Sequence, residues 1–277
     1  MPKIIIHSDK INGSLVQQLG GILNTDLVRE LGFMWTKSEK SLSKQQRADL
    51  SAEYKVDVSI LPNEFDPKNI KLLIMDMDST LINIECVDEI ADFLGIKPQV
   101  AAITESAMRG EIDFNTSLQK RVGLLKDLSS DVLLQVYEQR LKLNPGAEPL
   151  IAGLQQQGIK TALVSGGFTF FTERLKRRLA FDYTKANQLD VVDEKLSGKV
   201  MGPIVNASIK AQFLSQICQQ IGIHTSQAIA MGDGANDLEM MQLAGLGVAY
   251  KAKLKVQEQA DIMLNYSGLD SVLHLLA

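Results

Sequence analysis

The chain has 277 residues, 45% hydrophobic and 22% charged, a composition typical of a globular protein that can bury a sizeable core without disulfides. Its 29 basic and 33 acidic residues give a net charge of −4, which argues against a nucleic-acid partner. The N-terminus becomes charged too early for a secretory signal, and the charge-free stretch 211–232 contains five glutamines, so we expect no membrane partner.

The first part of the chain, residues 1–66, is predicted to form a small α/β domain. Short β-branched runs predict strands, and the longer stretches between them predict helices. Ser41 and Ser43 lie where a side chain could cap the second helix. The expected order is a strand at 3–7, a helix at 14–31, a strand at 33–36, a helix at 41–53 and a strand at 56–61.

The composition of the chain changes at 62–67, where two prolines and a polar cluster predict a linker. From residue 67 to 277, short apolar runs alternate with helical patterns. This alternation predicts an α/β fold with a Rossmann-like, doubly wound parallel sheet that has helices on both sides. The expected strands lie at 71–75, 161–165, 228–231 and 246–249, with a further short one at 261–264.

Two segments interrupt this alternation. Residues 84–145 contain helical patterns with no strand between them, which predicts a helical cap inserted after the first strand. Residues 187–205 contain alternating side chains around 195–198 and predict a β-hairpin. The helix predicted at 208–221 carries an apolar residue every four positions, at Ile209, Phe213, Ile217 and Ile221.

Two carboxylates follow the strand at 71–75 directly. Asp76 and Asp78 are two residues apart, so in an extended chain they point to the same side, at the strand's carboxyl end where open α/β sheets bind ligands. Their repulsion calls for a hard cation such as Mg²⁺. A turn with Asx-type hydrogen bonds is the simpler interpretation of such a pair taken alone.

Three weaker signals point to the same edge of the sheet. The sequence SGGF at 165–168 offers the Ser165 hydroxyl and close-lying amides to an anion, although many strand-to-helix turns look similar. The sequence GDGAND at 232–237 adds Asp233 and Asp237, which could also simply cap a helix. Lys210 would be a surface lysine in most contexts, but a phosphate site rich in carboxylates needs such a fixed cation. Together the signals favour phosphoryl chemistry.

These motifs, in this order, resemble the haloacid dehalogenase-like superfamily of phosphohydrolases and, within it, the family of phosphoserine phosphatases. The sequence DMDST at 76–80 matches the superfamily pattern DxDx[TV], and SGGF, Lys210 and GDGAND match its later motifs. The resemblance extends from Ile70 to the C-terminus. It includes segments typical of the family's cap, namely NIECVDEIA at 83–91, AMRG at 107–110 and FNTSLQKRVGLL at 114–125.

The resemblance implies a role for each matching residue. Asp76 would be the nucleophile, Asp78 the general acid and base, and Lys210 a catalytic cation that also holds phosphate. Mg²⁺ would be held by the Asp76 carboxylate, the Asp78 backbone carbonyl and Asp233. The implied substrate-binding residues are Glu85 for an ammonium, Arg121 for a carboxylate, Ser165, Gly166 and Lys210 for phosphate, Asn236 for phosphate or for the Lys210 side, and Met108 and Phe114 as a shield against water. Ordinary helix-surface charge pairing is the alternative for Glu85 and Arg121, and we expect Asp88 and Glu89 to be structural.

The implied activity is hydrolysis of phosphoserine through an aspartyl phosphate, the last step of serine biosynthesis. A phosphotransferase or a phosphatase for another small phosphomonoester would use the same residues, and a catalytically silent amino-acid sensor is the alternative from another class. Longer relatives carry an N-terminal ACT-like regulatory module, and we leave regulation, homodimerisation and packing open for residues 1–65. The separated Cys86 and Cys218 form no CxxC pair, which favours reduced thiols and a cytoplasmic location.

Overall fold

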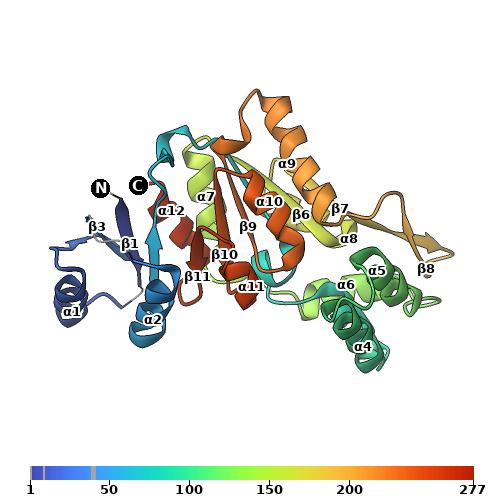
Figure 1. Ribbon diagram of the computed structural model, residues 1–277. Helices are drawn as coiled ribbons and strands as arrows, with labels where there is room; N and C mark the ends of the chain where they lie inside the picture. Colours follow the sequence, from blue (N-terminus) through green and yellow to red (C-terminus); the bar gives the residue numbers. More distant parts are fainter. Residues whose placement is uncertain (1, 9, 39–41) are drawn as a thin grey trace.

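The computed structural model describes residues 2–8, 10–38 and 42–277, which form two β-sheets joined by a short connection and surrounded by helices (Figure 1). The smaller sheet comes from the N-terminal part of the chain and the larger one from the rest. Within the described residues, no helix combines the length and the apolar character needed to cross a membrane. The division into separate domains at residue 66 stays a prediction.

The smaller sheet is antiparallel, and its strands and helices follow one another in the order strand, helix, strand, strand, helix, strand. This succession, with the first and last strands paired in the sheet, is the ferredoxin-like arrangement. The elements are β1 (Lys3–His7), α1 (Gly13–Leu23), β2 (Val28–Arg29), β3 (Phe33–Lys37), α2 (Lys44–Tyr54) and β4 (Asp57–Ile60), and the strand order is β2-β3-β1-β4.

The isoleucines of β1 explain how the smaller sheet holds its position. Successive side chains of a strand point to opposite faces. Ile4 and Ile6 pack with Leu19 of α1, whereas Ile5 joins the main hydrophobic core. The sheet therefore buries one face against its own helices and the other against the larger part of the molecule.

The predicted helix at 14–31 is wrong in its second half. It ends at Leu23 because Asn24 adopts a left-handed conformation (φ 53°), and its N–H caps the carbonyls of the last turn. The second helix begins as predicted after Ser43, whose hydroxyl accepts the N–H of Gln46 in a capping box. Ser41, the other predicted cap, lies outside the described residues.

The larger sheet is parallel except for one antiparallel pair at its edge, formed by the two strands of the hairpin at 183–201. This arrangement confirms the predicted fold class. Each predicted strand is present, but the second extends three residues beyond the expected end at Ser165. The strands are β5 (Leu72–Met75), β6 (Lys160–Phe168), β7 (Tyr183–Val192), β8 (Lys195–Met201), β9 (Ala228–Gly232), β10 (Leu246–Tyr250) and β11 (Ile262–Leu264), in the spatial order β11-β10-β9-β5-β6-β7-β8.

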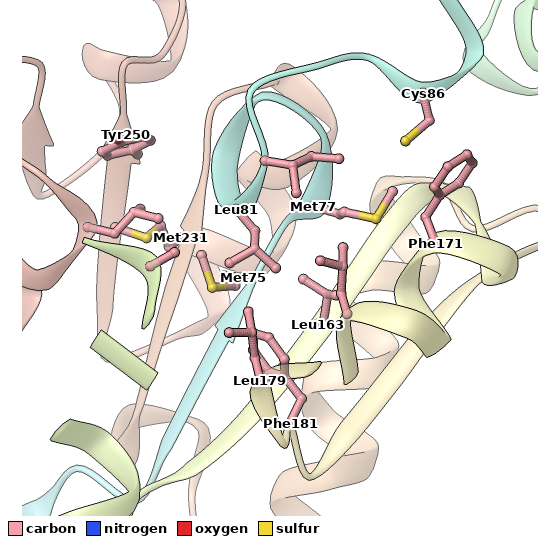
Figure 2. Packing of buried hydrophobic residues seen from close by; sticks show 14 of the residues in the cluster. Met75, Met77, Leu81, Cys86, Leu163, Phe171, Leu179, Phe181, Met231 and Tyr250 are labelled. Carbon is pink, nitrogen blue, oxygen red and sulfur yellow. The ribbon is translucent and has the colours of Figure 1, made fainter. Parts of the chain in front are cut away.

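Helices cover both faces of this sheet. Figure 2 shows side chains from one face, where Met75, Leu163 and Met231 of three neighbouring strands lie among the main core. The opposite face packs Ile74 and Ala230 against other helices. The helices beyond the cap are α7 (Ala147–Gln156), α8 (Thr169–Leu179), α9 (Ala207–Ile221), α10 (Leu238–Leu243), α11 (Leu254–Gln257) and α12 (Val272–Leu275).

The predicted cap is a group of four helices beside the carboxyl edge of the sheet (Figure 1). The predicted hairpin is formed by β7 and β8, and the Asp127 N–H donates to the Leu196 carbonyl at 2.8 Å, which ties the hairpin to the cap. The cap helices are α3 (Cys86–Phe93), α4 (Lys97–Met108), α5 (Phe114–Gly123) and α6 (Asp131–Gln139). Single turns lie at η1 (Pro67–Asn69), η2 (Met77–Leu81), η3 (Thr225–Gln227), η4 (Ala235–Asp237) and η5 (Leu269–Ser271).

Candidate active site

The strand order places three loops around the end of the central strand β5. Its neighbours are β6 on one side and β9 on the other, so the loops after β5 and β9 and the end of β6 meet at one edge. The chain proceeds outward in opposite directions from this point, which is where doubly wound sheets form ligand crevices. A cavity of about 880 Å³ lies there, between the sheet edge and the cap.

Asp76 and Asp78 lie at the floor of this cavity, as their spacing predicts. The backbone of both residues is extended, and the following residue, Ser79, turns the chain with a φ of 57°. Both carboxylates are buried, at 4% and 9% exposure, although each faces the cavity. A charged group in such a place needs compensation from its neighbours.

Lys210 supplies that compensation from beneath the floor. Its ammonium has no solvent exposure and lies 2.5 Å from Asp76 Oδ1 and 2.7 Å from Asp237 Oδ1. Burial alone would lower the pKa of Lys210, but Asp237 and Asp76 together raise it above its ordinary value. Burial also raises the pKa of Asp76, and Lys210 opposes that shift. Lys210 therefore stays protonated, and its positive charge lies against the Asp76 carboxylate.

A group of carboxylates able to hold a metal ion surrounds this pair. One oxygen each from Asp76, Asp233 and Asp237 lies within 4.8 Å of the others. The Thr80 hydroxyl donates to Asp233 Oδ1 at 3.2 Å. Burial first, and then the charge of Asp237, raise the pKa of Asp233 to about 6. One lysine does not balance these charges, and an all-oxygen donor set suits a hard divalent cation.

Asp237 has a larger part in this group than its sequence context indicated. Its Oδ2 does accept the Gly234 N–H at 3.1 Å, as a capping carboxylate would. Its other oxygen, however, pairs with Lys210, and the pair joins α9 to the loop after β9. The position of Asp237 in GDGAND was the available signal, but the partner lies on another element and cannot be inferred from local spacing.

Two hydrogen bonds hold Asp78 in place. Its Oδ1 accepts the Cys86 N–H at 2.9 Å, and its Oδ2 accepts the Ser165 hydroxyl at 3.1 Å. Burial raises the pKa of Asp78, while the amide and thiol of Cys86 and the Ser165 hydroxyl lower it in part. Asp78 can therefore hold a proton more readily than an exposed aspartate.

The two glycines of SGGF are required by close packing at the end of β6. A Cβ atom at Gly167 would collide with Asp78 Oδ2, and one at Gly166 would lie 2.8 Å from the Phe114 ring. The strand continues through Phe168 with a shift in its pairing to β7, instead of ending at Ser165 as predicted. The Gly167 N–H donates to Ser165 Oγ at 2.7 Å, so the backbone fixes the hydroxyl that holds Asp78.

The cap side of the cavity carries opposite charges. Glu85 precedes α3 and accepts the Ser79 hydroxyl at 2.6 Å, and Arg121 is on α5. Burial in the cavity first, and then the charge of Asp78, raise the pKa of Glu85 to about 8. The other predicted cavity residues, Met108, Phe114, Gly166, Asn236 and Asp233, also line it, whereas Ser165 and Lys210 lie buried below its floor.

Comparison with known proteins places the chain in a family. A family model described as haloacid dehalogenase-like hydrolase matches residues 70–245. The chain belongs to this hydrolase family. The match covers strands β5 to β9 of the larger sheet, the cap and all the carboxylates at the cavity floor, and it confirms the resemblance drawn from the motifs.

Relatives within the family include phosphoserine phosphatases. The chain is 51% identical to "Phosphoserine phosphatase" from Polaromonas sp. over 224 residues, 79% of this chain and 95% of the relative. A crystal structure of a HAD family hydrolase from Salmonella enterica superposes with a TM-score of 0.90 at 34% identity, over 99% of this chain and 98% of the other. "Phospho-Aspartyl Intermediate Analogue of Phosphoserine phosphatase" gives a TM-score of 0.71 at 40% identity, over 75% and 99%.

Proposed function

We propose that this protein hydrolyses phosphoserine to serine and inorganic phosphate. The observation that carries the proposal is a single cavity that has the Asp76–Lys210 pair at its floor and both Glu85 and Arg121 on its cap side. A phosphorylated amino acid needs an anion for its ammonium and a cation for its carboxylate, at a distance from the phosphate site. The names of the relatives support the same substrate.

The first step transfers the phosphoryl group to the protein. An oxygen of Asp76 attacks phosphorus, and the bond between phosphorus and the serine oxygen breaks. Asp78 gives its proton to that oxygen as it leaves, and the raised pKa of Asp78 keeps the proton available. Lys210 holds the charge of Asp76 before the attack and stabilises the phosphoryl group after it.

The second step frees the enzyme. Asp78, now ionised, takes a proton from water, and the water oxygen attacks phosphorus. The bond between phosphorus and Asp76 breaks, and phosphate leaves with Asp76 restored as a carboxylate. The Gly166 amide and Asn236, which line the cavity, hold the phosphate oxygens in both steps, while Met108 and Phe114 exclude bulk water beneath the cap. The Ser165 hydroxyl, below the floor, would have to turn from Asp78 to join them.

The group formed by Asp76, Asp233 and Asp237 fits Mg²⁺. Asp76, Asp233 and the Asp78 carbonyl would hold the ion, with Asp237 as a further neighbour. When bound, Mg²⁺ would neutralise charge on the phosphoryl oxygens. In the cap, Glu85 in its ionised form pairs with the substrate ammonium, and the Arg121 guanidinium binds the carboxylate through two parallel hydrogen bonds.

Phosphate release from a panel of phosphomonoesters tests the proposal. We expect release from phosphoserine with Mg²⁺, a value of kcat/KM well above those of phenyl phosphate and phosphoethanolamine, and no release with a chelator. A flat preference across the panel would contradict the proposal. Addition of a small alcohol distinguishes a phosphotransferase, which would form a new phosphoester in place of inorganic phosphate.

A further inference from the structure

Asp88 is a charged residue of the cavity that the mechanism above does not use. It lies in the first turn of α3, one turn after Glu85, and its side chain lines the cavity. Its Oδ1 atom is buried and has no hydrogen-bond partner among the described residues. A buried acceptor without a partner is costly, so its retention at this place calls for an explanation.

The neighbouring Glu89 shows what a structural carboxylate looks like on the same helix. It pairs with Lys97 at 3.0 Å and with Arg140 at 3.7 Å. The expectation that Glu89 is structural fits these contacts. In the described part of the chain Asp88 has no such ion pair, and it faces the cavity instead.

Arg121 of α5 lines the same cavity as Asp88, and among the charged groups it has the largest effect on the Asp88 carboxylate. Burial lowers the pKa of Arg121, and Asp88 opposes that lowering more than Glu85 or Asp78 does. Burial raises the pKa of Asp88, and Arg121 is the first of the charges that oppose it. The two side chains thus stabilise each other's charged form across the space between α3 and α5, without a direct ion pair within 4.0 Å.

Among the residues that the structure describes, the Arg121 side chain has one hydrogen-bond partner. Its Nε donates weakly to the Ser117 carbonyl at 3.4 Å, and no hydrogen bond to its two terminal nitrogens is found among the described residues. Four N–H groups are therefore available, of which a substrate carboxylate uses two. Without a counter-charge, fixing this long side chain on binding would cost side-chain entropy.

We propose that Asp88 is a positioning residue that holds the Arg121 guanidinium at the carboxylate end of the cavity, so that the site selects phosphomonoesters carrying a carboxylate. The inference rests on the proposed function. It assigns Asp88 to Arg121 and leaves the substrate ammonium to Glu85, whose carboxylate is already oriented by the Ser79 hydroxyl.

Four phosphomonoesters distinguish recognition of the substrate carboxylate from recognition of its ammonium. Phosphoserine has both, phosphoethanolamine lacks the carboxylate, phosphoglycolate lacks the ammonium, and phenyl phosphate has neither. In the Asp88→Asn variant we expect KM to rise about 10-fold for phosphoserine and phosphoglycolate, because the negative charge that offsets the Arg121 guanidinium is lost, and to change less than about 2-fold for the others. We expect kcat to stay within about 2-fold on all four.

A double-mutant cycle shows whether Asp88 acts through Arg121. Arg121→Ala alone raises KM for phosphoserine, and Asp88→Asn is expected to add nothing in that background. Glu89→Gln is the matched control, because it removes the same charge from the same helix outside the cavity, and its KM values should equal those of the wild type. Thermal unfolding of each variant checks the fold.

The outcomes are distinguishable. A wild type without preference for phosphoserine contradicts the proposed function itself. A wild type with that preference, combined with an Asp88→Asn effect that is absent, equal on phosphoethanolamine, or fully additive to Arg121→Ala, overturns the inference alone. Asp88→Glu, which keeps the charge, is a second variant: KM for phosphoserine should stay within about 3-fold of the wild type, and a loss as large as that of a folded Asp88→Asn would also overturn it.

Discussion

Two regions of the molecule bury carboxylates, and they treat them in opposite ways. At the cavity floor, Asp76, Asp78, Asp233 and Asp237 lie close together, and Asp76 and Asp237 share the ammonium of Lys210. At the junction between the two sheets, Asp57 of β4 is fully buried, and its carboxylate forms no ion pair with any described residue. Its oxygens accept the backbone N–H groups of residues 265, 266 and 267, at 2.7 to 3.3 Å, and the Ser267 hydroxyl.

The difference separates a carboxylate that stabilises the fold from one kept for chemistry. The Asp57 carboxylate accepts hydrogen bonds from three backbone N–H groups and one hydroxyl, all of them neutral donors. These bonds stabilise the junction and leave the carboxylate no room for a ligand. The floor carboxylates instead repel one another, and burial raises the pKa of Asp76 and Asp233. Such a cluster gains from any added positive charge, which is the condition for binding a cation.

The largest effect that would test this contrast is expected for Asp76→Asn. The amide cannot attack phosphorus, so kcat for phosphoserine should fall by a factor on the order of 10⁵. The fold should persist, because the change removes one of several repelling charges and Lys210 keeps Asp237. Steady-state phosphate release and thermal unfolding measure the two quantities. Normal turnover by the purified variant would remove Asp76 from its role.

Lys210→Met is expected to damage both activity and fold. It leaves Asp76 and Asp237 buried without their cation, and breaking a buried pair in this way costs about 3–5 kcal/mol of the free energy of unfolding. Denaturant titration measures the loss. The double variant Asp76→Asn with Lys210→Met should recover part of the stability but no activity. Equal stability of the single and double variants would show that the lysine does not compensate Asp76.

Asp57→Asn should reverse the pattern of Asp76→Asn. Three N–H donors and a hydroxyl lose a charged acceptor, so the free energy of unfolding should fall by about 2–3 kcal/mol. The junction lies away from the cavity lining, and kcat/KM for phosphoserine should equal that of the wild type at a temperature where both are folded. A large loss of activity with intact stability would mean that the junction acts on the site.

The sequence was informative where a pattern is local. Apolar runs bounded by turn residues located the strands, because a buried parallel strand needs no partner to be recognised. The spacing of Asp76 and Asp78 located both in one cavity, since an extended chain repeats its direction every two residues. The end of α1 was missed because its apolar period continues to Leu31, whereas the structure breaks it at Asn24.

Contacts between distant elements could not be predicted in this way. The Asp237–Lys210 pair joins the loop after β9 to helix α9, and the Asp78–Ser165 bond joins the loop after β5 to strand β6. Only their motifs hinted at these contacts. Asp57 looked like an ordinary polar residue of an alternating strand, yet its partners are 208 to 210 positions away. The roles of the cavity residues stay predictions until they are tested.

The smallest expected effect concerns His7, at the junction. The ring is fully buried between the Ser59 hydroxyl and the His274 ring, each 3.0 Å away, and burial first, then His274, lower the pKa of His7 to about 3. Below pH 6.5 the unfolded chain therefore takes up a proton that the folded chain refuses until about pH 3. The contribution of neutral His7 to the free energy of unfolding is fully present above pH 6.5. It should fall by about 2 kcal/mol between pH 6.5 and pH 5.

His7→Gln tests this because glutamine cannot take up that proton. The variant should start from a lower free energy of unfolding at pH 7, since it loses two ring contacts, but its decline between pH 6.5 and pH 5 should be shallower by about 2 kcal/mol. If the free energy of unfolding fell equally with pH in the wild type and in His7→Gln, the fold would not resist protonation of His7. Burial would then affect charged groups at the cavity floor and not at the junction.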